Sequence, residues 1–131
     1  MRTLSRIQGP TATHFSSGRV LPHLDAVVGT GTAAVGVSVL EDLAQLKAAA
    51  RGRISLLGNL NGIEMVDWTV ETAEARVKEA LAKAGPGGGF ILADNHGEIP
   101  WQVPEEVLDA VGDAVRRWGR YPLEWVGAGV P

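Results

Sequence analysis

The chain of 131 residues contains no cysteine, which excludes disulfides, thiolate nucleophiles and thiolate metal ligands. Aromatic residues make up only 5% of the sequence, and no apolar run approaches the ~18 residues of a membrane-spanning helix. The formal net charge is −3, with both signs interspersed, so the chain has no basic stripe that would bind phosphate backbones. We therefore expect a soluble, cytoplasmic protein that binds neither nucleic acid nor membranes.

The overall composition is that of a globular protein. Hydrophobic residues account for 45% of the sequence and charged residues for 21%, both close to average values. This length suits one domain with a sizeable core. We expect a single domain over residues 1–131, in which residues 1–10 and 120–131 are peripheral tails.

Short apolar runs alternate with amphipathic stretches four times along the chain. The apolar runs are predicted strands and lie near residues 11–15, 33–38, 54–58 and 89–94. The amphipathic stretches are predicted helices and lie at about residues 20–28, 41–51 and 71–84, and beyond Pro104. The apolar runs are continuous rather than alternating, as in strands that are covered on both faces. Strands separated by helices imply four right-handed parallel βα units, an α/β fold.

Helix signals are clearest in the second half of the chain. Thr69 and Gly85 are the expected caps of the third helix, and Glu74 precedes Lys78 by four residues on its expected solvent face. The last helix has an expected core-facing stripe made of Leu108, Val111, Val115 and Trp118.

Polar side chains gather where each predicted strand ends. They are His14 and Ser16, then Ser38, then Asn59 and Asn61, and finally Asp94, Asn95, His96 and Glu98. The carboxyl ends of parallel strands share one edge of a sheet, where ligands bind. The alternative is that these are ordinary polar loops. Periodicity alone leaves open whether the sheet is a four-stranded open sheet or half of a (β/α)8 barrel.

Four segments, in order, resemble motifs of the uroporphyrinogen decarboxylases and the related corrinoid-linked methyltransferases. Leu56–Gly62 resembles their GNLDP strand and loop, and residues 87–100 resemble their GGGYIL…GHGIPP segment. Val103–Val107 is similar to TPPENV, and residues 13–18 are similar to the H-x-C-G strand end of the methyltransferase branch. Order and spacing match over about residues 11–120. The resemblance implies the last four βα units of a (β/α)8 barrel, so the roles of the front half cannot be carried over.

The resemblance to the methyltransferases implies a metal site. In that branch the His and Cys of H-x-C-G and a later Cys hold zinc. His14 matches the first ligand, and His96 stands at the later Cys. Ser16 stands at the first Cys, or Ser17 does if the turn is one residue longer. A serine hydroxyl is a poor zinc ligand, so we expect any site for zinc or another divalent metal to use His14 and His96, completed by Glu98 or, as the alternative, by Asp94. A corrinoid partner is a further implication of this branch.

The remaining candidates form a small-molecule site. We assign His96 and Asp94 as catalytic residues and Asn59, Ser16 and Trp101 as substrate-binding residues. The alternatives are structural: hydrogen-bonded loop histidines and a tryptophan packed in the core.

Two classes of function follow. The first is a methyltransferase-like enzyme or enzyme subunit, with a decarboxylase-like lyase as its alternative, and the second is a non-catalytic binding or scaffold module. A half barrel leaves two edge strands unpaired. Its concave face is expected to be lined by apolar strand residues such as Val35, Val37, Leu56 and Ile91, depending on the pleat. We therefore expect a homodimer that closes an eight-stranded barrel, or a complementary half-barrel chain.

Overall fold

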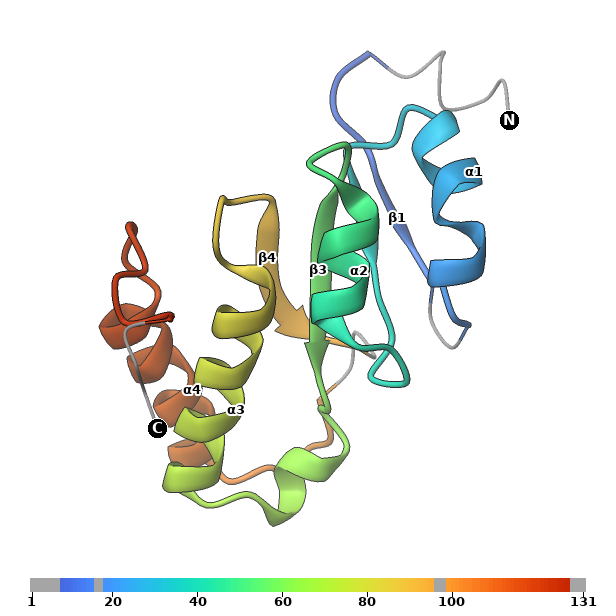
Figure 1. Ribbon diagram of the computed structural model, residues 1–131. Helices are drawn as coiled ribbons and strands as arrows, with labels where there is room; N and C mark the ends of the chain where they lie inside the picture. The colour runs from blue at the N-terminus through green and yellow to red at the C-terminus, as the bar shows by residue number, and fades with distance from the viewer. Residues whose placement is uncertain (1–7, 16–17, 96–98, 128–131) are drawn as a thin grey trace.

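The computed structural model describes residues 8–15, 18–95 and 99–127, and its sheet has four strands in sequential order (Figure 1). The strands β1 (Ala12–His14), β2 (Ala34–Gly36), β3 (Ser55–Leu60) and β4 (Phe90–Asp94) are all parallel. A doubly wound sheet would reverse its strand order at a switch point, which this sheet does not do. The predicted α/β fold of four consecutive βα units, matching half of a TIM-type barrel, is confirmed.

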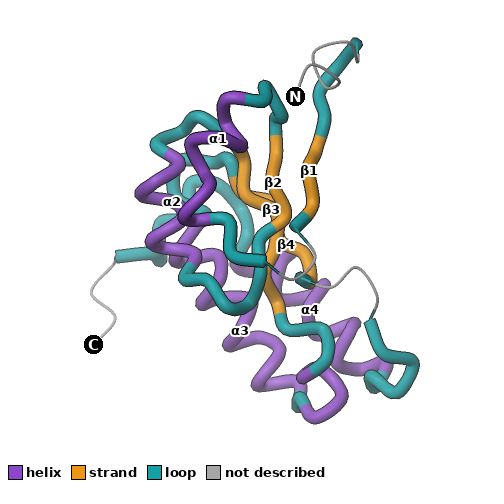
Figure 2. The backbone as a smooth tube through the Cα atoms, turned by 90° about the vertical axis from the view of Figure 1, so that its right-hand side faces the viewer, coloured by secondary structure: helices purple, strands orange, loops and turns teal. Residues whose placement is uncertain are grey.

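Each strand is followed by a helix, as the sequence predicts. The helices are α1 (Leu24–Gly29), α2 (Leu43–Ala50), α3 (Val70–Ala84) and α4 (Glu105–Trp118), with short 3-10 turns η2 (Leu21–His23) and η3 (Glu64–Asp67). In the side view, α1 and α2 lie on one side of the strands (Figure 2). Within the described ranges, no helix is long and apolar enough to cross a membrane.

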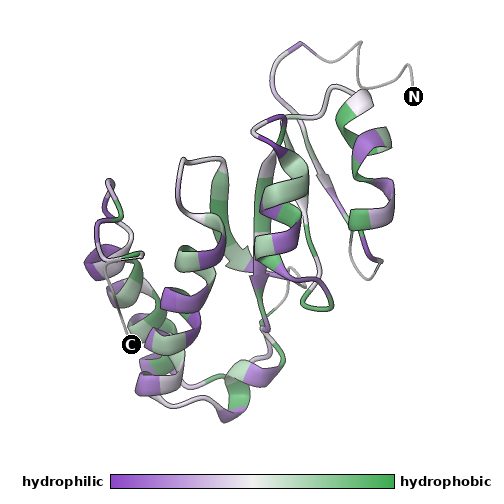
Figure 3. Ribbon diagram, in the orientation of Figure 1, coloured by the Kyte–Doolittle hydropathy of each residue, from purple (hydrophilic) through white to green (hydrophobic). Residues whose placement is uncertain are grey.

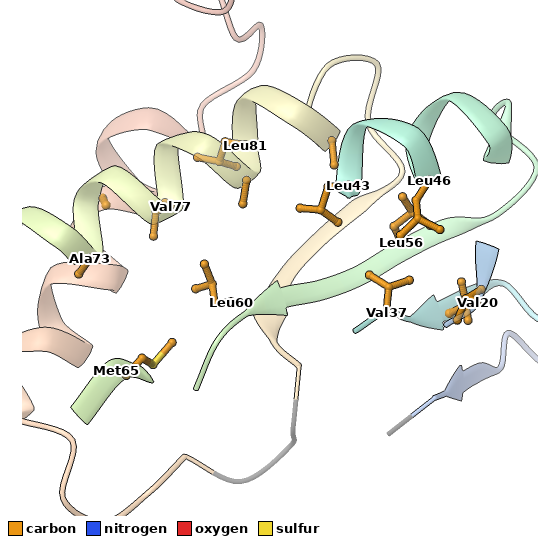
Figure 4. Close-up of a cluster of buried hydrophobic side chains, with 14 of the residues drawn as sticks. Val20, Val37, Leu43, Leu46, Leu56, Leu60, Met65, Ala73, Val77 and Leu81 are labelled. Atoms are coloured by element: carbon orange, nitrogen blue, oxygen red, sulfur yellow. The ribbon is translucent and has the colours of Figure 1, made fainter. Parts of the chain in front are cut away.

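The core lies between the sheet and its helices. Val35, Leu56 and Phe90 form one row across β2, β3 and β4, and the first two are fully buried. Leu56 lies beside Leu46 of α2, and Leu60 lies below α3 (Figure 4). Val35, Val37 and Leu56 therefore belong to the helix-covered face, and their expected place on a concave face was wrong.

The opposite face of the sheet is open. The next row of paired residues is His14, Gly36, Leu57 and Ile91. His14 is exposed, and Ile91 is 50% exposed, because no helix of the described chain covers this side. Ile91 is thus the one residue of the four expected on the concave face that the structure places there.

Local capping explains where α2 and α3 begin. The Asp42 side chain accepts hydrogen bonds from the amides of Ala44 and Gln45, and Thr69 Oγ1 accepts from the amide of Thr72. These bonds satisfy helix donors that have no partner within the helix. Thr69 was predicted as a cap and is confirmed, and the buried face of α3 (Ala73, Val77, Ala80, Leu81 and Ala84) is the predicted one. Hydrophobic and hydrophilic residues alternate along the turns of α3 (Figure 3).

The buried face of α4 differs from the predicted stripe. This helix packs mainly along α3 and buries Val107, Ala110 and Ala114. Leu108 is 41% exposed and Val115 is 38% exposed, so the prediction was wrong for these two residues. Each of them directly follows a buried residue, Val107 or Ala114. Successive helix residues are ~100° apart, so Leu108 and Val115 lie together on one flank of the buried face.

Residues 119–127 fold back onto α3 and α4. The rings of Trp118 and Trp125 meet edge to face with centroids 5.6 Å apart, and Trp125 Nε1 donates to the Trp118 carbonyl at 2.9 Å. Lys78 Nζ lies 3.9 Å from the Trp118 ring centroid, and Glu74 Oε1 accepts from Trp118 Nε1 at 2.7 Å. Glu74 and Lys78, which were expected to interact along α3, also both contact Trp118 of α4.

Candidate functional site

His14 lies at the carboxyl end of β1 on the open face of the sheet. It pairs in register with Gly36 of β2, and its imidazole lies directly over that glycine. A Cβ atom on residue 36 would collide with the Nδ1 atom of His14, so only glycine leaves room for the ring. The two strands therefore seat one imidazole at the carboxyl end of the sheet, which is the edge where parallel α/β proteins bind ligands.

Asn59 ties the end of β3 to the loop that follows β2. Its Nδ2 donates to the carbonyl oxygens of Ser38 at 2.9 Å and Glu41 at 3.1 Å. The preceding Gly58 has φ 143° and lies so close to β2 that a Cβ there would be 2.9 Å from the Val37 oxygen. The side-chain NH2 group of Asn59 holds the loop through these two hydrogen bonds. The predicted contact with substrate would therefore use its side-chain oxygen, Oδ1.

Asp94 ends β4 and turns away from the open face. Strand alternation places it opposite to Ile91 and Ala93, and its Oδ2 lies 3.4 Å from where a Cβ of Gly62 would be. The amide of Asn95 then donates to the Leu60 carbonyl at 3.0 Å, which keeps the chain on the sheet beyond the strand. β1 and β4 are separated by two strands, ~14 Å along the sheet. His14 and Asp94 thus lie far apart on this edge.

Trp101 follows β4 and is 97% exposed. Its indole contributes neither to the core nor to any described cavity of this chain. The alternative of a tryptophan packed in the core is therefore wrong. The role of Trp101 in substrate binding stays a prediction.

Several predicted site residues lie outside the described residues. They are Ser16, His96 and Glu98. The catalytic role of His96, the substrate role of Ser16 and the metal roles of His96 and Glu98 stay predictions. In the part of the chain that the structure does describe, no group of three or more His, Asp or Glu side chains is placed to hold a metal ion.

A cleft of about 440 Å³ opens beside Asn59, between the loop after β2, the end of β3, η3 and α3. Its α3 wall carries Arg76, Glu79 and Lys83, with Glu79 bridging Lys83 at 3.0 Å and Arg76 at 3.1 Å. The hydrogen bond from Lys83 lowers the pKa of Glu79, and the same bond raises the pKa of Lys83. The sequence analysis missed this cleft, because its charged wall reads as an ordinary solvated helix face.

The fold is that of a segment of a (β/α)8 barrel, a class of proteins in which ligands bind at the carboxyl ends of the strands. Residues 2–118 match the family model of uroporphyrinogen decarboxylase (URO-D), and the chain belongs to this family. A uroporphyrinogen decarboxylase of Mannheimia succiniciproducens is 32% identical over 102 residues, which cover 76% of this chain and 28% of the relative. A uroporphyrinogen decarboxylase of Cellvibrio japonicus is 36% identical over 83 residues, which cover 63% of this chain and 23% of the relative.

A solved structure shares the same fold. A methyltransferase from Methanosarcina mazei superposes with a TM-score of 0.74 at 24% identity, over 89% of this chain and 34% of that chain. The chain thus spans about a third or less of the length of the relatives it matches. The predicted resemblance of the chain to this superfamily is confirmed.

Proposed function

We propose that the chain supplies the last four βα units of a URO-D-type barrel and contacts a small-molecule substrate at its strand carboxyl ends, as part of a decarboxylase-like lyase. The observation that carries this proposal is the imidazole of His14, seated over Gly36 on the open face. Active sites of (β/α)8 enzymes are built at this end of the strands. The names of the relatives favour decarboxylase chemistry, whereas the methyltransferase structure supports the fold alone.

Within this proposal, His14 binds a carboxylate of the substrate. A protonated imidazole donates from both ring nitrogens, and a neutral one still donates from one. Hydrogen bonds between charged partners are about twice as strong as neutral ones, which suits recognition of an acidic substrate. The carbonyl oxygen of Asn59 would accept from a donor of the same ligand, and Asp94, with His96, remains the proposed catalytic group.

Titration with uroporphyrinogen under anaerobic conditions tests this role, with quenching of the four tryptophans as the readout. His14→Ala should weaken binding about 10-fold, as expected for one charge-assisted hydrogen bond. His23→Ala is the matched control, because His23 is an exposed residue of η2 that the proposal does not place at the ligand, and this variant should bind as wild type. Equal affinities for both variants, or no binding by the wild type, would contradict the proposal.

A methyltransferase-like enzyme is the second candidate, favoured by the similarity of residues 13–18 to the H-x-C-G strand end. It would need zinc or another divalent metal on His14, His96 and Glu98, and a corrinoid partner. Elemental analysis of the purified protein separates the candidates. Stoichiometric zinc that is lost in His14→Ala would favour the methyltransferase, whereas a metal-free protein that still binds uroporphyrinogen would favour the lyase. A protein that binds neither would indicate a scaffold module.

A further inference from the structure

A pocket of about 570 Å³ opens at the amino end of the sheet, the end opposite to that of His14. Its wall is formed by the last turn of α2 and by residues at or just before the starts of β2, β3 and β4. The described lining residues include two basic side chains, Lys47 and Arg53, and no acidic one. The net charge of the chain is −3, so this pocket is a local concentration of positive charge. Such a pocket attracts a negatively charged ligand.

Lys47 differs from the other two lysines of the chain in its surroundings. Lys83 is paired with Glu79 at 3.0 Å. The charge of Lys78 acts on Glu74, whose pKa it helps to lower. Among the described residues no acidic side chain pairs with Lys47, and partial burial lowers the pKa of its ammonium group. A partly buried charge without a counter-ion costs free energy, and an anion bound beside Lys47 would offset that cost.

Ser55 brings a hydroxyl group to the same place. The position that a Cβ atom of Gly89 would take lies 3.8 Å from Lys47 Nζ and 4.0 Å from Ser55 Oγ. Lys47 Nζ donates one hydrogen bond to the carbonyl oxygen of Gly88, which leaves two of its three hydrogens. The Ser55 hydroxyl has no hydrogen-bond partner among the described residues. An ammonium group of α2 and a hydroxyl group of β3 are therefore both available beside the glycine loop.

Arg53 keeps the pocket positive although a helix ends beside it. The C-terminal end of a helix carries partial negative charge, and α2 ends at Ala50. Arg53 Nε donates to the carbonyl oxygen of Ala50 at 3.1 Å, and Nη2 donates to that of Ala49 at 2.9 Å. Nη2 also donates to Asp25 at 2.8 Å, but the Asp25 side chain is 88% exposed, so solvent screens its charge. Nη1 of Arg53 takes no part in these bonds.

We propose that this pocket binds the phosphate group of a small phosphorylated molecule, through Lys47, Ser55 and Arg53. A phosphate has more acceptor oxygens and more negative charge than a carboxylate, so it suits donors that come from different segments of the chain. Lysine is a common phosphate ligand, which it binds as a point charge. A pocket of this size also has room for the rest of a small molecule. Ser55 lies ~13 Å along β3 from Asn59, so the inference is independent of the proposed substrate site.

An NMR titration at constant ionic strength measures the binding of inorganic phosphate and of glycerol phosphate. We expect both to bind, and acetate to bind at least 10-fold more weakly. Lys47→Met should weaken phosphate binding at least 10-fold and Ser55→Ala about 5-fold, as expected for lost hydrogen bonds to a charged group. Ser55→Ala leaves the bond between Lys47 and Gly88 in place, so it tests the pocket even if Lys47→Met unfolds the chain. Lys83→Met, outside this pocket, is the matched control and should bind as wild type.

The pKa of Lys47 supplies a second readout, because the three lysines can be followed separately through their ¹³Cε resonances. A bound phosphate stabilises the charged form of the ammonium, so saturating phosphate should raise the pKa of Lys47 and leave those of Lys78 and Lys83 unchanged. Equal shifts at all three lysines would show an adventitious ion only and would overturn the proposal. Phosphate binding that Lys47→Met and Ser55→Ala both leave intact would also overturn it. Phosphate binding without uroporphyrinogen binding would contradict the proposed function alone.

Discussion

At the scale of single residues, the site depends on a pairing that the sequence does not display. The resemblance to the H-x-C-G strand end was enough to single out His14, and continuous apolar runs were enough to place the strands within a residue or two. The seat that Gly36 provides could not be predicted, because it depends on the register between β1 and β2. Register follows from the packing of the whole sheet and not from either strand alone.

Gly36→Ala tests this seat. The new methyl group must displace the His14 ring, so we expect a loss of about 1–3 kcal/mol in the free energy of unfolding, typical of overpacking. Urea unfolding of Gly36→Ala, His14→Ala and the double variant measures it. The double variant should recover most of the loss, since the clash requires both residues. Gly29→Ala, where nothing lies near the added atom, is the control and should cost little. Purely additive losses would show that the ring can move aside freely.

At the scale of elements, the strands were easier to predict than the faces of the helices. α4 carries apolar residues both at Val107, Ala110 and Ala114 and at Leu108 and Val115, all at helical spacing. Periodicity cannot choose between two such adjacent stripes, because both satisfy the same 3.6-residue repeat. The choice depends on the position of α3, which a single sequence does not give. The charged wall of the cleft was missed because its residues have the pattern of an ordinary solvated helix face.

The link between α3 and α4 should make stability depend on pH. The hydrogen bond from Trp118 Nε1, helped by Arg117, lowers the pKa of Glu74. A carboxyl group with a lowered pKa in the folded state stabilises the fold above its ordinary pKa, and this contribution is lost as the pH falls through the lowered value. Trp118→Phe should therefore reduce stability at neutral pH and leave a smaller loss on acidification, measured by urea unfolding at both pH values. Trp101→Phe, at an almost fully exposed position, is the control and should have the stability of the wild type at both pH values. If Trp118→Phe lost as much stability on acidification as the wild type, the role of Glu74 would be contradicted.

At the scale of the whole molecule, the chain is a sheet with a second layer of helices, of which α4 is the outermost. α3 contacts β3, β4 and α2 on one side and α4 on the other. Residues 119–127 are attached in turn to these two helices, through Trp118, Trp125 and the bond from the Tyr121 hydroxyl to the Gly85 carbonyl at 2.6 Å. The terminal part of the chain is therefore connected to the sheet mainly through α3.

This serial attachment has a consequence for how the native state opens. Segments that can detach without breaking the rest of the core open with less free energy than global unfolding, as cooperative units. In the monomer, α4 and the residues after it should open together, before α3 and the strands. Native-state hydrogen exchange at low denaturant should give the amides of α4 one shared opening free energy, below that of β3. Equal values for α4 and β3 would instead mean that the outermost helix is released only when the whole chain unfolds.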